Sequence, residues 1–90
     1  MNQQKEKTLI GFKKASSLLA KIIAMVESDQ YCIDIMQQNL AAIGLLKSAH
    51  QQILEGHLTH CFKEAMDTTS AAKKQKMVEE IMSVTRMANK

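Results

Sequence analysis

The sequence predicts an all-α protein, and three observations lead to this class. The chain has 90 residues with no proline and 3 glycines. Ala, Leu, Ile, Met, Lys, Gln and Glu dominate its composition, as is typical of helical proteins. Apolar residues recur at helical spacing, and no strand-type alternation of any length is present. We expect one domain, residues 1–90, whose small size and 3 aromatic residues leave it dependent on oligomerisation to complete a core.

Three helices account for the pattern of apolar residues. We expect the first over residues 7–27, a long second helix over residues 30–66 and a shorter third over residues 71–87. Ser28 and Asp29 offer oxygen atoms that can cap the amino end of the long helix, and the stretch Asp67-Thr68-Thr69-Ser70 is the only convincing internal break. The apolar positions recur every three or four residues, as one helix face requires: Leu9, Phe12, Leu19, Ile22, Ile23 and Val26 in the first helix, and Ile33, Met36, Leu40, Ile43, Leu46, Ile53, Leu54, Leu58 and Phe62 in the second.

The amino terminus lacks the apolar core of a signal peptide, and Lys21 interrupts the longest apolar stretch. We therefore expect no membrane segment and a cytoplasmic location. In that reducing compartment, two cysteines favour metal or redox chemistry over a structural disulfide.

Cys32, His57 and Cys61 form the one plausible set of soft metal ligands. His57 and Cys61 stand at positions i and i+4, so on a helix they emerge from the same face and can bind one ion together. Cys32 precedes Cys61 by 29 positions, which on one continuous helix corresponds to roughly 43 Å. If the three side chains share a metal, the third ligand must therefore come from another chain. The alternative is that both cysteines are merely small buried hydrophobic residues.

A symmetry in the long helix points to a dimer. Two antiparallel copies place residue i beside residue 93 − i when the midpoint of the two cysteines, between Leu46 and Lys47, lies at the crossing. Cys32 of each chain then faces Cys61 of the other, which predicts an isologous dimer with two sites. Small residues near the midpoint would let the backbones approach closely, although such residues are also common in helices generally: Ala41, Ala42, Gly44, Ser48 and Ala49.

The stretch Tyr31-Cys32-Ile33-Asp34, the 24-residue interval before His57 and the His-x-x-x-Cys ending resemble the copper-sensitive operon repressor (CsoR) family. The resemblance covers the second helix without a gap and extends more weakly to both flanks. It implies a copper-responsive repressor, assembled as a dimer of dimers, in which Cys32 binds the metal together with His57 and Cys61 of the partner subunit. It also implies that Tyr31 and Glu80, or Glu79 in place of Glu80, couple the metal to the rest of the assembly.

The chemistry of the ligands favours the same metal without the resemblance. Two thiolates and one imidazole make a soft site of low coordination number that suits Cu(I), whereas structural zinc normally takes four ligands. His60 points about 100° away from Cys61 around a helix, and we expect it to be a solvated surface residue. His50 lies well over a turn away and is expected to be structural or exposed. The methionines are scattered over all three helices, and filling of the core explains them.

The first helix gives weaker support for DNA binding. The family carries an arginine-rich segment there, followed by glycine and glutamine, but this chain has Ser17 and Leu18 at the last two places and its one arginine is Arg86. Lysine holds a phosphate as a point charge without the planar fork of arginine. Three lysines match basic positions of the family and would form a phosphate-binding face across a tetramer, or else simply a solvated helix surface: Lys13, Lys14 and Lys47.

Two functions remain open at this point. In the first, the copper-free tetramer binds operator DNA and Cu(I) releases it, through a coupling that must be reciprocal. In the second, the chain has kept the metal site, has lost DNA recognition and acts as a cytosolic Cu(I) buffer or chaperone. We expect no enzyme, because the sequence has no evident pair of catalytic carboxylates, no glycine-rich phosphate loop and no nucleophile with an oriented base. A redox or persulfide sensor would use the thiols but leave the histidine without a role.

Overall fold

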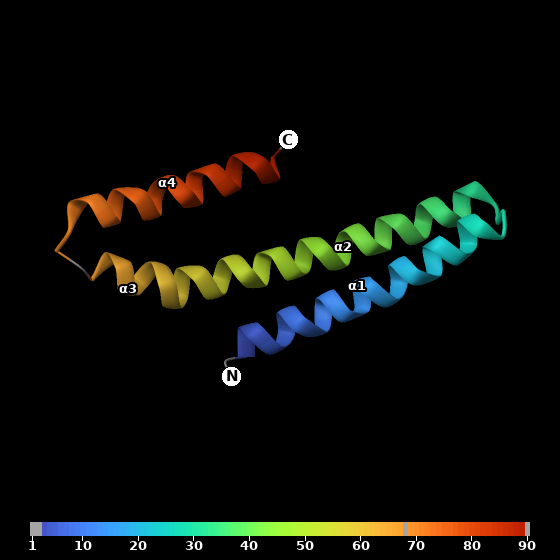
Figure 1. Cartoon of the computed structure of the whole chain (residues 1–90), viewed down its shortest axis with the longest axis horizontal. Helices are drawn as coiled ribbons and strands as arrows, with labels where there is room; N and C mark the ends of the chain where they lie inside the picture. The colour runs from blue at the N-terminus through green and yellow to red at the C-terminus, as the bar shows by residue number, and fades with distance from the viewer. Residues whose placement is uncertain (1–2, 68, 90) are drawn as a thin grey trace. The chain divides into compact units, whose positions relative to one another are not determined.

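The computed structural model describes residues 3–67 and 69–89, apart from the side chains of Gln3 and Phe62, and all regular elements of these residues are helical (Figure 1). In chain order the elements are α1 (Gln3–Glu27), α2 (Cys32–Gly56), η1 (His57–Phe62), α3 (Lys63–Met66) and α4 (Ala71–Ala88). Because α2, η1 and α3 follow one another directly, they form the long central helical run. The all-α class with three helical runs is confirmed. Thr68, part of the predicted break, lies outside the described residues.

The chain divides into two compact units, Met1–Glu55 and Gly56–Lys90. The first contains α1 and all of α2 except its last residue, and the second contains η1, α3 and α4. That the two units act as a single domain stays a prediction. None of the helices in the described part of the chain is both long enough and apolar enough to cross a membrane.

The first unit is an antiparallel helical hairpin that small residues hold closely together. The side-chain amide of Gln4 donates a hydrogen bond of 3.2 Å to the carboxylate of Glu55. A Cβ atom added to Gly11 would lie 3.6 Å from the Cβ of Ala49. This approach is possible because neither position carries a bulky side chain, and Ala49 is only 1% exposed. The interface buries Ala15 and Met25 from α1 and Ala42 and Ala49 from α2.

This packing corrects one expectation about the small residues of α2. Ala42 and Ala49 contribute to the hairpin core, so they are not available for a crossing between two chains. Ala41, Gly44 and Ser48 are exposed, and no atom lies within 4 Å of a Cβ placed on Gly44. The predicted set therefore belongs to two different faces of the helix.

The turn between α1 and α2 is formed differently from the sequence-based prediction. Asp29 has a positive φ of 54°, its N–H donates to the carbonyl of Val26 at 3.1 Å, and the N–H of Gln30 donates to the carbonyl of Met25 at 3.0 Å. These bonds form a Schellman motif that ends α1. The Ser28 hydroxyl donates back to the carbonyl of Ala24 at 2.8 Å. The prediction that Ser28 and Asp29 cap α2 was wrong, because α2 begins only at Cys32, and the same residue types instead end the preceding helix.

The second unit is built from η1, α3 and α4, with α3 in contact with both of the others. Ser70 adopts an extended conformation, and its hydroxyl accepts a 3.3 Å hydrogen bond from the backbone N–H of Lys73. This bond satisfies one of the unpaired N–H groups at the start of a helix, so the prediction of a cap at this break is confirmed for Ser70. α4 ends at Ala88, one residue beyond the expected position.

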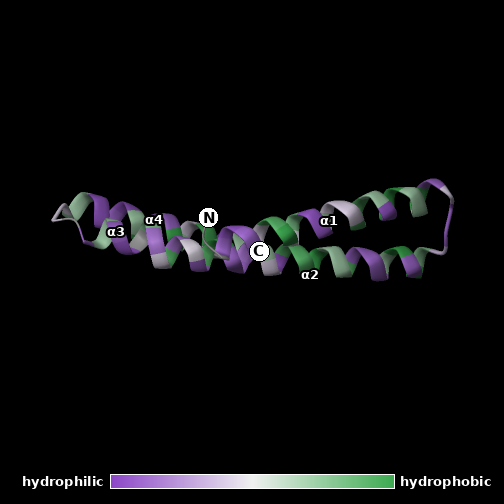
Figure 2. Cartoon of the chain, turned by 90° about the horizontal axis from the view of Figure 1, so that it is seen from below, coloured by the Kyte–Doolittle hydropathy of each residue, from purple (hydrophilic) through white to green (hydrophobic). Residues whose placement is uncertain are grey.

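Large apolar side chains remain exposed on both helices of the hairpin. Figure 2 shows hydrophobic and hydrophilic residues following one another along α1 and α2. The first unit exposes more than a third of the surface of the following side chains: Leu9, Ile10, Phe12, Leu19, Ile23, Val26, Tyr31, Ile33, Met36, Leu40, Ile43, Leu46 and Ile53. Three of the four buried residues in the described part of the chain are alanines. Such a surface is typical of a subunit that completes its core by association.

Candidate metal centre

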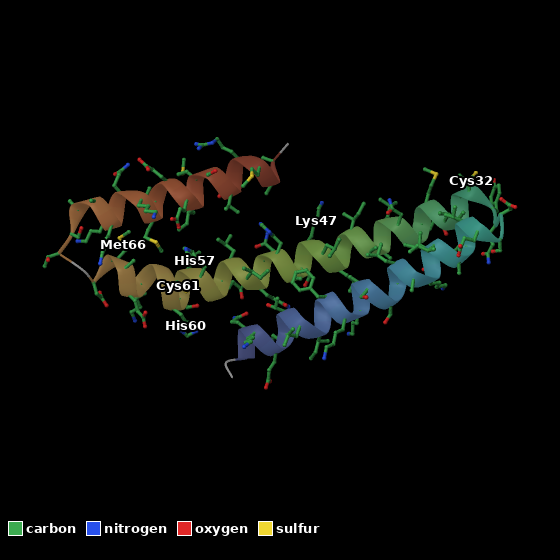
Figure 3. The ribbon with its side chains drawn as sticks, viewed as in Figure 1. Cys32, Lys47, His57, His60, Cys61 and Met66 are labelled. Atoms are coloured by element: carbon green, nitrogen blue, oxygen red, sulfur yellow. The ribbon has the colours of Figure 1, made fainter. Side chains whose placement is uncertain are left out.

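Cys32 is the first residue of α2, at the end of the helix next to the α1–α2 turn (Figure 3). The first backbone bond of the helix runs from the N–H of Ile35 to the carbonyl of Tyr31. Cys32 is exposed and is not part of a disulfide. Its thiol is therefore presented at the surface of the hairpin by a regular α-helix.

His57 and Cys61 both lie in η1, where the central helical run changes from α-helical to π-helical hydrogen bonding. We predicted one continuous α-helix over residues 30–66, and this stretch corrects that prediction. A π-helix forms i→i+5 hydrogen bonds and therefore has a wider turn, so a residue four positions later falls just short of a full turn and still shares a face with the first. Apolar spacing cannot distinguish the two helix types over so short a segment. Single π-helical turns are frequent at functional sites.

The second cysteine is also accessible. Cys61 is exposed and free of any disulfide, whereas His57 is partly buried. Within the single chain neither thiol is buried, so the alternative that the cysteines are small hydrophobic residues applies only to an interface with another chain.

The three predicted ligands do not meet within the described residues of one chain. No group of three His, Cys, Asp or Glu side chains there is close enough to hold a metal ion. Cys32 belongs to the first unit, and His57 and Cys61 belong to the second. α2 alone has 25 residues, which places its ends roughly 36 Å apart. The described chain therefore presents one thiol at one end of α2 and an imidazole with a second thiol just beyond the other end.

The residues expected to couple the metal to the assembly are both exposed. The Tyr31 side chain is 66% exposed at the start of α2. Glu80 is an exposed residue of α4, and the neighbouring Glu79 accepts a 3.2 Å hydrogen bond from the side-chain amide of Gln75. That Glu80, or Glu79 in its place, couples the metal to the assembly stays a prediction.

The three candidate DNA-binding lysines lie in the hairpin. Lys13 and Lys14 are exposed residues of α1, and Lys47 is an exposed residue of α2. Figure 3 shows Lys47 on the side of α2 that faces away from α1. A phosphate-binding face that all three share across a tetramer stays a prediction.

The remaining histidines and methionines divide clearly by exposure. His50 and His60 are exposed, and Figure 3 shows His60 on the other side of the helix from His57. Only Met25 among the described methionines is fully buried, at 6% exposure. Met36, Met82 and Met87 are more than half exposed, so filling of the core does not explain these three within the chain.

Comparisons with known proteins agree on one family. The family model described as "Metal-sensitive transcriptional repressor" matches residues 4–87. The copper-sensing transcriptional repressor RicR of Mycobacterium tuberculosis is 28% identical over 85 residues, which cover 94% of this chain and 88% of that protein. The copper-sensing transcriptional repressor CsoR of Mycobacterium ulcerans is 38% identical over 66 residues, which cover 73% of this chain but only 56% of that protein.

The fold of this chain also agrees with the solved structure of a copper-sensing repressor. The crystal structure of the copper-sensing repressor CsoR with Cu(I) from Geobacillus thermodenitrificans superposes with a TM-score of 0.86 and 26% sequence identity. The match covers 100% of this chain and 92% of that one. These homologues are copper-sensing transcriptional repressors rather than enzymes.

Proposed function

We propose that this chain, which belongs to the family of metal-sensitive transcriptional repressors, represses transcription in the absence of copper and leaves its operator when Cu(I) binds. The observation that carries the proposal is the placement of two exposed thiols and one imidazole on a single helical run. This donor set fits Cu(I), because soft sulfur ligands and low coordination numbers favour that ion. Its relatives are copper-sensing repressors, which supports the same ligand.

The metal site is an intersubunit site in this proposal. Cys32 of one chain binds the ion together with His57 and Cys61 of the partner subunit, in an antiparallel dimer that pairs further into a tetramer. The length of α2 supports this arrangement, because a regular helix keeps its two ends apart. The exposed apolar side chains of α1 and α2 support an oligomer, because association would remove them from water.

The proposed switch is an equilibrium between two conformations of the tetramer. Cu(I) prefers the conformation with lower DNA affinity, so DNA must weaken Cu(I) binding by the same free energy. Tyr31 and Glu80 take part in this coupling, and Lys13, Lys14 and Lys47 contact phosphates. Each lysine contact adds to the salt dependence of DNA binding.

Fluorescence anisotropy with labelled DNA from the region upstream of the protein's own gene tests this function. We expect saturable binding by the copper-free protein that survives physiological salt and is lost when Cu(I) is added. Cys61→Ala provides the matched control, since it should bind the DNA but not respond to Cu(I). Absence of salt-resistant binding to this DNA would contradict the repressor function.

A Cu(I) buffer or chaperone is the second candidate function. The observation in its favour is the scarcity of arginine, since Arg86 in α4 is the only one in the chain and the α1 residues at the family's glycine and glutamine are Ser17 and Leu18. In this case the protein would bind Cu(I) tightly and show only weak, salt-sensitive attraction to any DNA. The same titration therefore separates the two functions.

A further inference from the structure

The amino end of α2 carries a second sulfur side chain one turn after Cys32. Met36 follows Cys32 at i+4, so both side chains emerge from the same face of the helix. Cys32 is exposed, and Met36 is 58% exposed. Met25, in contrast, is buried between the two helices of the hairpin. Met36 is thus a thioether at the surface, beside a thiol that the proposed function assigns to the metal.

Met36 also has a specific position in the symmetry of the helical run. In the antiparallel register that sets residue i beside residue 93 − i, Cys32 faces Cys61 of the partner subunit and Met36 faces His57 of the partner subunit. Each half of the site then consists of two side chains at i and i+4, a Cys-x-x-x-Met pair and a His-x-x-x-Cys pair. The first pair lies on the α-helical α2 and the second in the π-helical η1, and in both a residue four positions later shares a face with the first. In this register the two pairs would bring four donor side chains toward one point.

We propose that Met36 supplies its thioether sulfur to the Cu(I) site, beside Cys32 of its own chain and opposite His57 and Cys61 of the partner subunit. This inference rests on the proposed intersubunit site. A thioether is a soft donor that suits Cu(I), and it adds no charge to a site that already holds two thiolates. Because zinc takes thiolate, imidazole and carboxylate ligands, the thioether also favours Cu(I) over Zn²⁺.

An apolar contact between subunits is the competing explanation for an exposed methionine here. Leu40 and Ile43 on the same helix are also exposed, at 66% and 40%. Leucine would serve such a contact equally well, since exchange of Met for Leu conserves volume and apolar character. Met36→Leu therefore removes the sulfur while preserving the packing.

Copper X-ray absorption spectroscopy on protein labelled with selenomethionine tests the inference directly. We expect a Cu–Se scattering contribution in the labelled wild-type protein that Met36→Leu abolishes. Met87→Leu is the matched control, because Met87 is 61% exposed and lies on α4 in the other unit. This variant should keep the Cu–Se contribution.

A competition assay against a Cu(I) chelator measures the effect on affinity. Met36→Leu should weaken Cu(I) binding by roughly tenfold, in the range seen when groups supporting a metal site are removed. Met87→Leu should leave the Cu(I) affinity unchanged.

The possible outcomes separate this inference from the function on which it rests. Cu(I) bound by sulfur and nitrogen, with no selenium contribution in the wild-type protein, would remove Met36 from the site and leave the other three ligands in place. A selenium contribution that persists in Met36→Leu would also exclude Met36 as a ligand, because another methionine would then supply the selenium. A wild-type protein that does not bind Cu(I) would overturn the proposed function itself. Circular dichroism of both variants should match that of the wild-type protein.

Discussion

The two compact units of the chain each carry part of the candidate metal site, but they are built differently. The first unit is a hairpin of regular α-helices that buries Ala15, Met25, Ala42 and Ala49. The second unit begins with the π-helical η1 and has no buried residue among those that the structure describes. Regions with few buried contacts open at lower free energy than densely packed ones. A metal bound across two chains would therefore connect the more densely packed unit of one to the less densely packed unit of the other.

The largest effect should come from removing either thiolate, whichever unit carries it. We expect Cys61→Ala and Cys32→Ala each to weaken Cu(I) binding on the order of 100-fold or more, beyond the loss seen for residues that only support a metal site. A competition titration with a Cu(I) chelator measures the loss. If Cys32→Ala retains wild-type affinity, the first unit contributes no thiolate to the site.

Mixed dimers of the two cysteine variants test whether each site is shared between two chains. A heterodimer of Cys32→Ala and Cys61→Ala chains should regain one complete site. At that site, the Cys61→Ala chain supplies Cys32, and the Cys32→Ala chain supplies His57 and Cys61. The expected stoichiometry is one tightly bound Cu(I) per mixed dimer, measured after joint refolding and separation by distinct affinity tags. Mixed dimers that bind no Cu(I) would favour a site within one chain.

The firm packing of the first unit can be tested by overfilling it. Ala49→Leu should lower the free energy of unfolding by about 1–3 kcal/mol, because the added side chain would meet α1 near Gly11. Urea unfolding followed by circular dichroism measures the change. Ala20→Leu, at an exposed position of α1, is the control and should have little effect. Equal stability of the two variants would show that the α1–α2 contact is looser than described.

A smaller effect is expected from the cap in the second unit. Ser70→Ala removes the acceptor for the N–H of Lys73 and should cost about 1 kcal/mol of helix stability. Hydrogen exchange of the first turn of α4 should accelerate accordingly, whereas Ser83→Ala, on the exposed surface of the same helix, should not change it. Exchange that is unaffected by Ser70→Ala would mean that the cap contributes little to this unit.

The helices could be predicted because their periodic apolar pattern is a local property. The cap at Ser70 followed from the same kind of reasoning, since a hydroxyl just before a helix has few other roles. Asp29 was assigned to the wrong helix because aspartate favours two neighbouring places, the N-cap of a helix and the left-handed residue after one. The start of α1 at Gln3 was also missed, since polar residues there give no apolar pattern.

The candidate site was only partly accessible from the sequence. The spacing of His57 and Cys61 singles them out, and the length of the helix separates them from Cys32. The π-helical turn leaves no mark in a pattern that repeats every three or four residues. Ala42 and Ala49 were grouped with exposed small residues because the sequence does not say which face of α2 meets α1. The apolar pattern predicts a core position for Met36, whereas its side chain is 58% exposed at i+4 from Cys32.

The change from α-helical to π-helical hydrogen bonding at His57 alters how far the backbone rotates about the helix axis along η1. Six π-helical residues rotate less about the helix axis than six α-helical residues do. The difference is roughly 100°, the rotation that one residue contributes in an α-helix. Rewinding it would swing everything after Phe62 around the helix axis, including the Ser70 cap and all of α4. If His57 and Cys61 bind Cu(I) as proposed, two of the metal ligands lie in the segment whose hydrogen bonding sets this rotation.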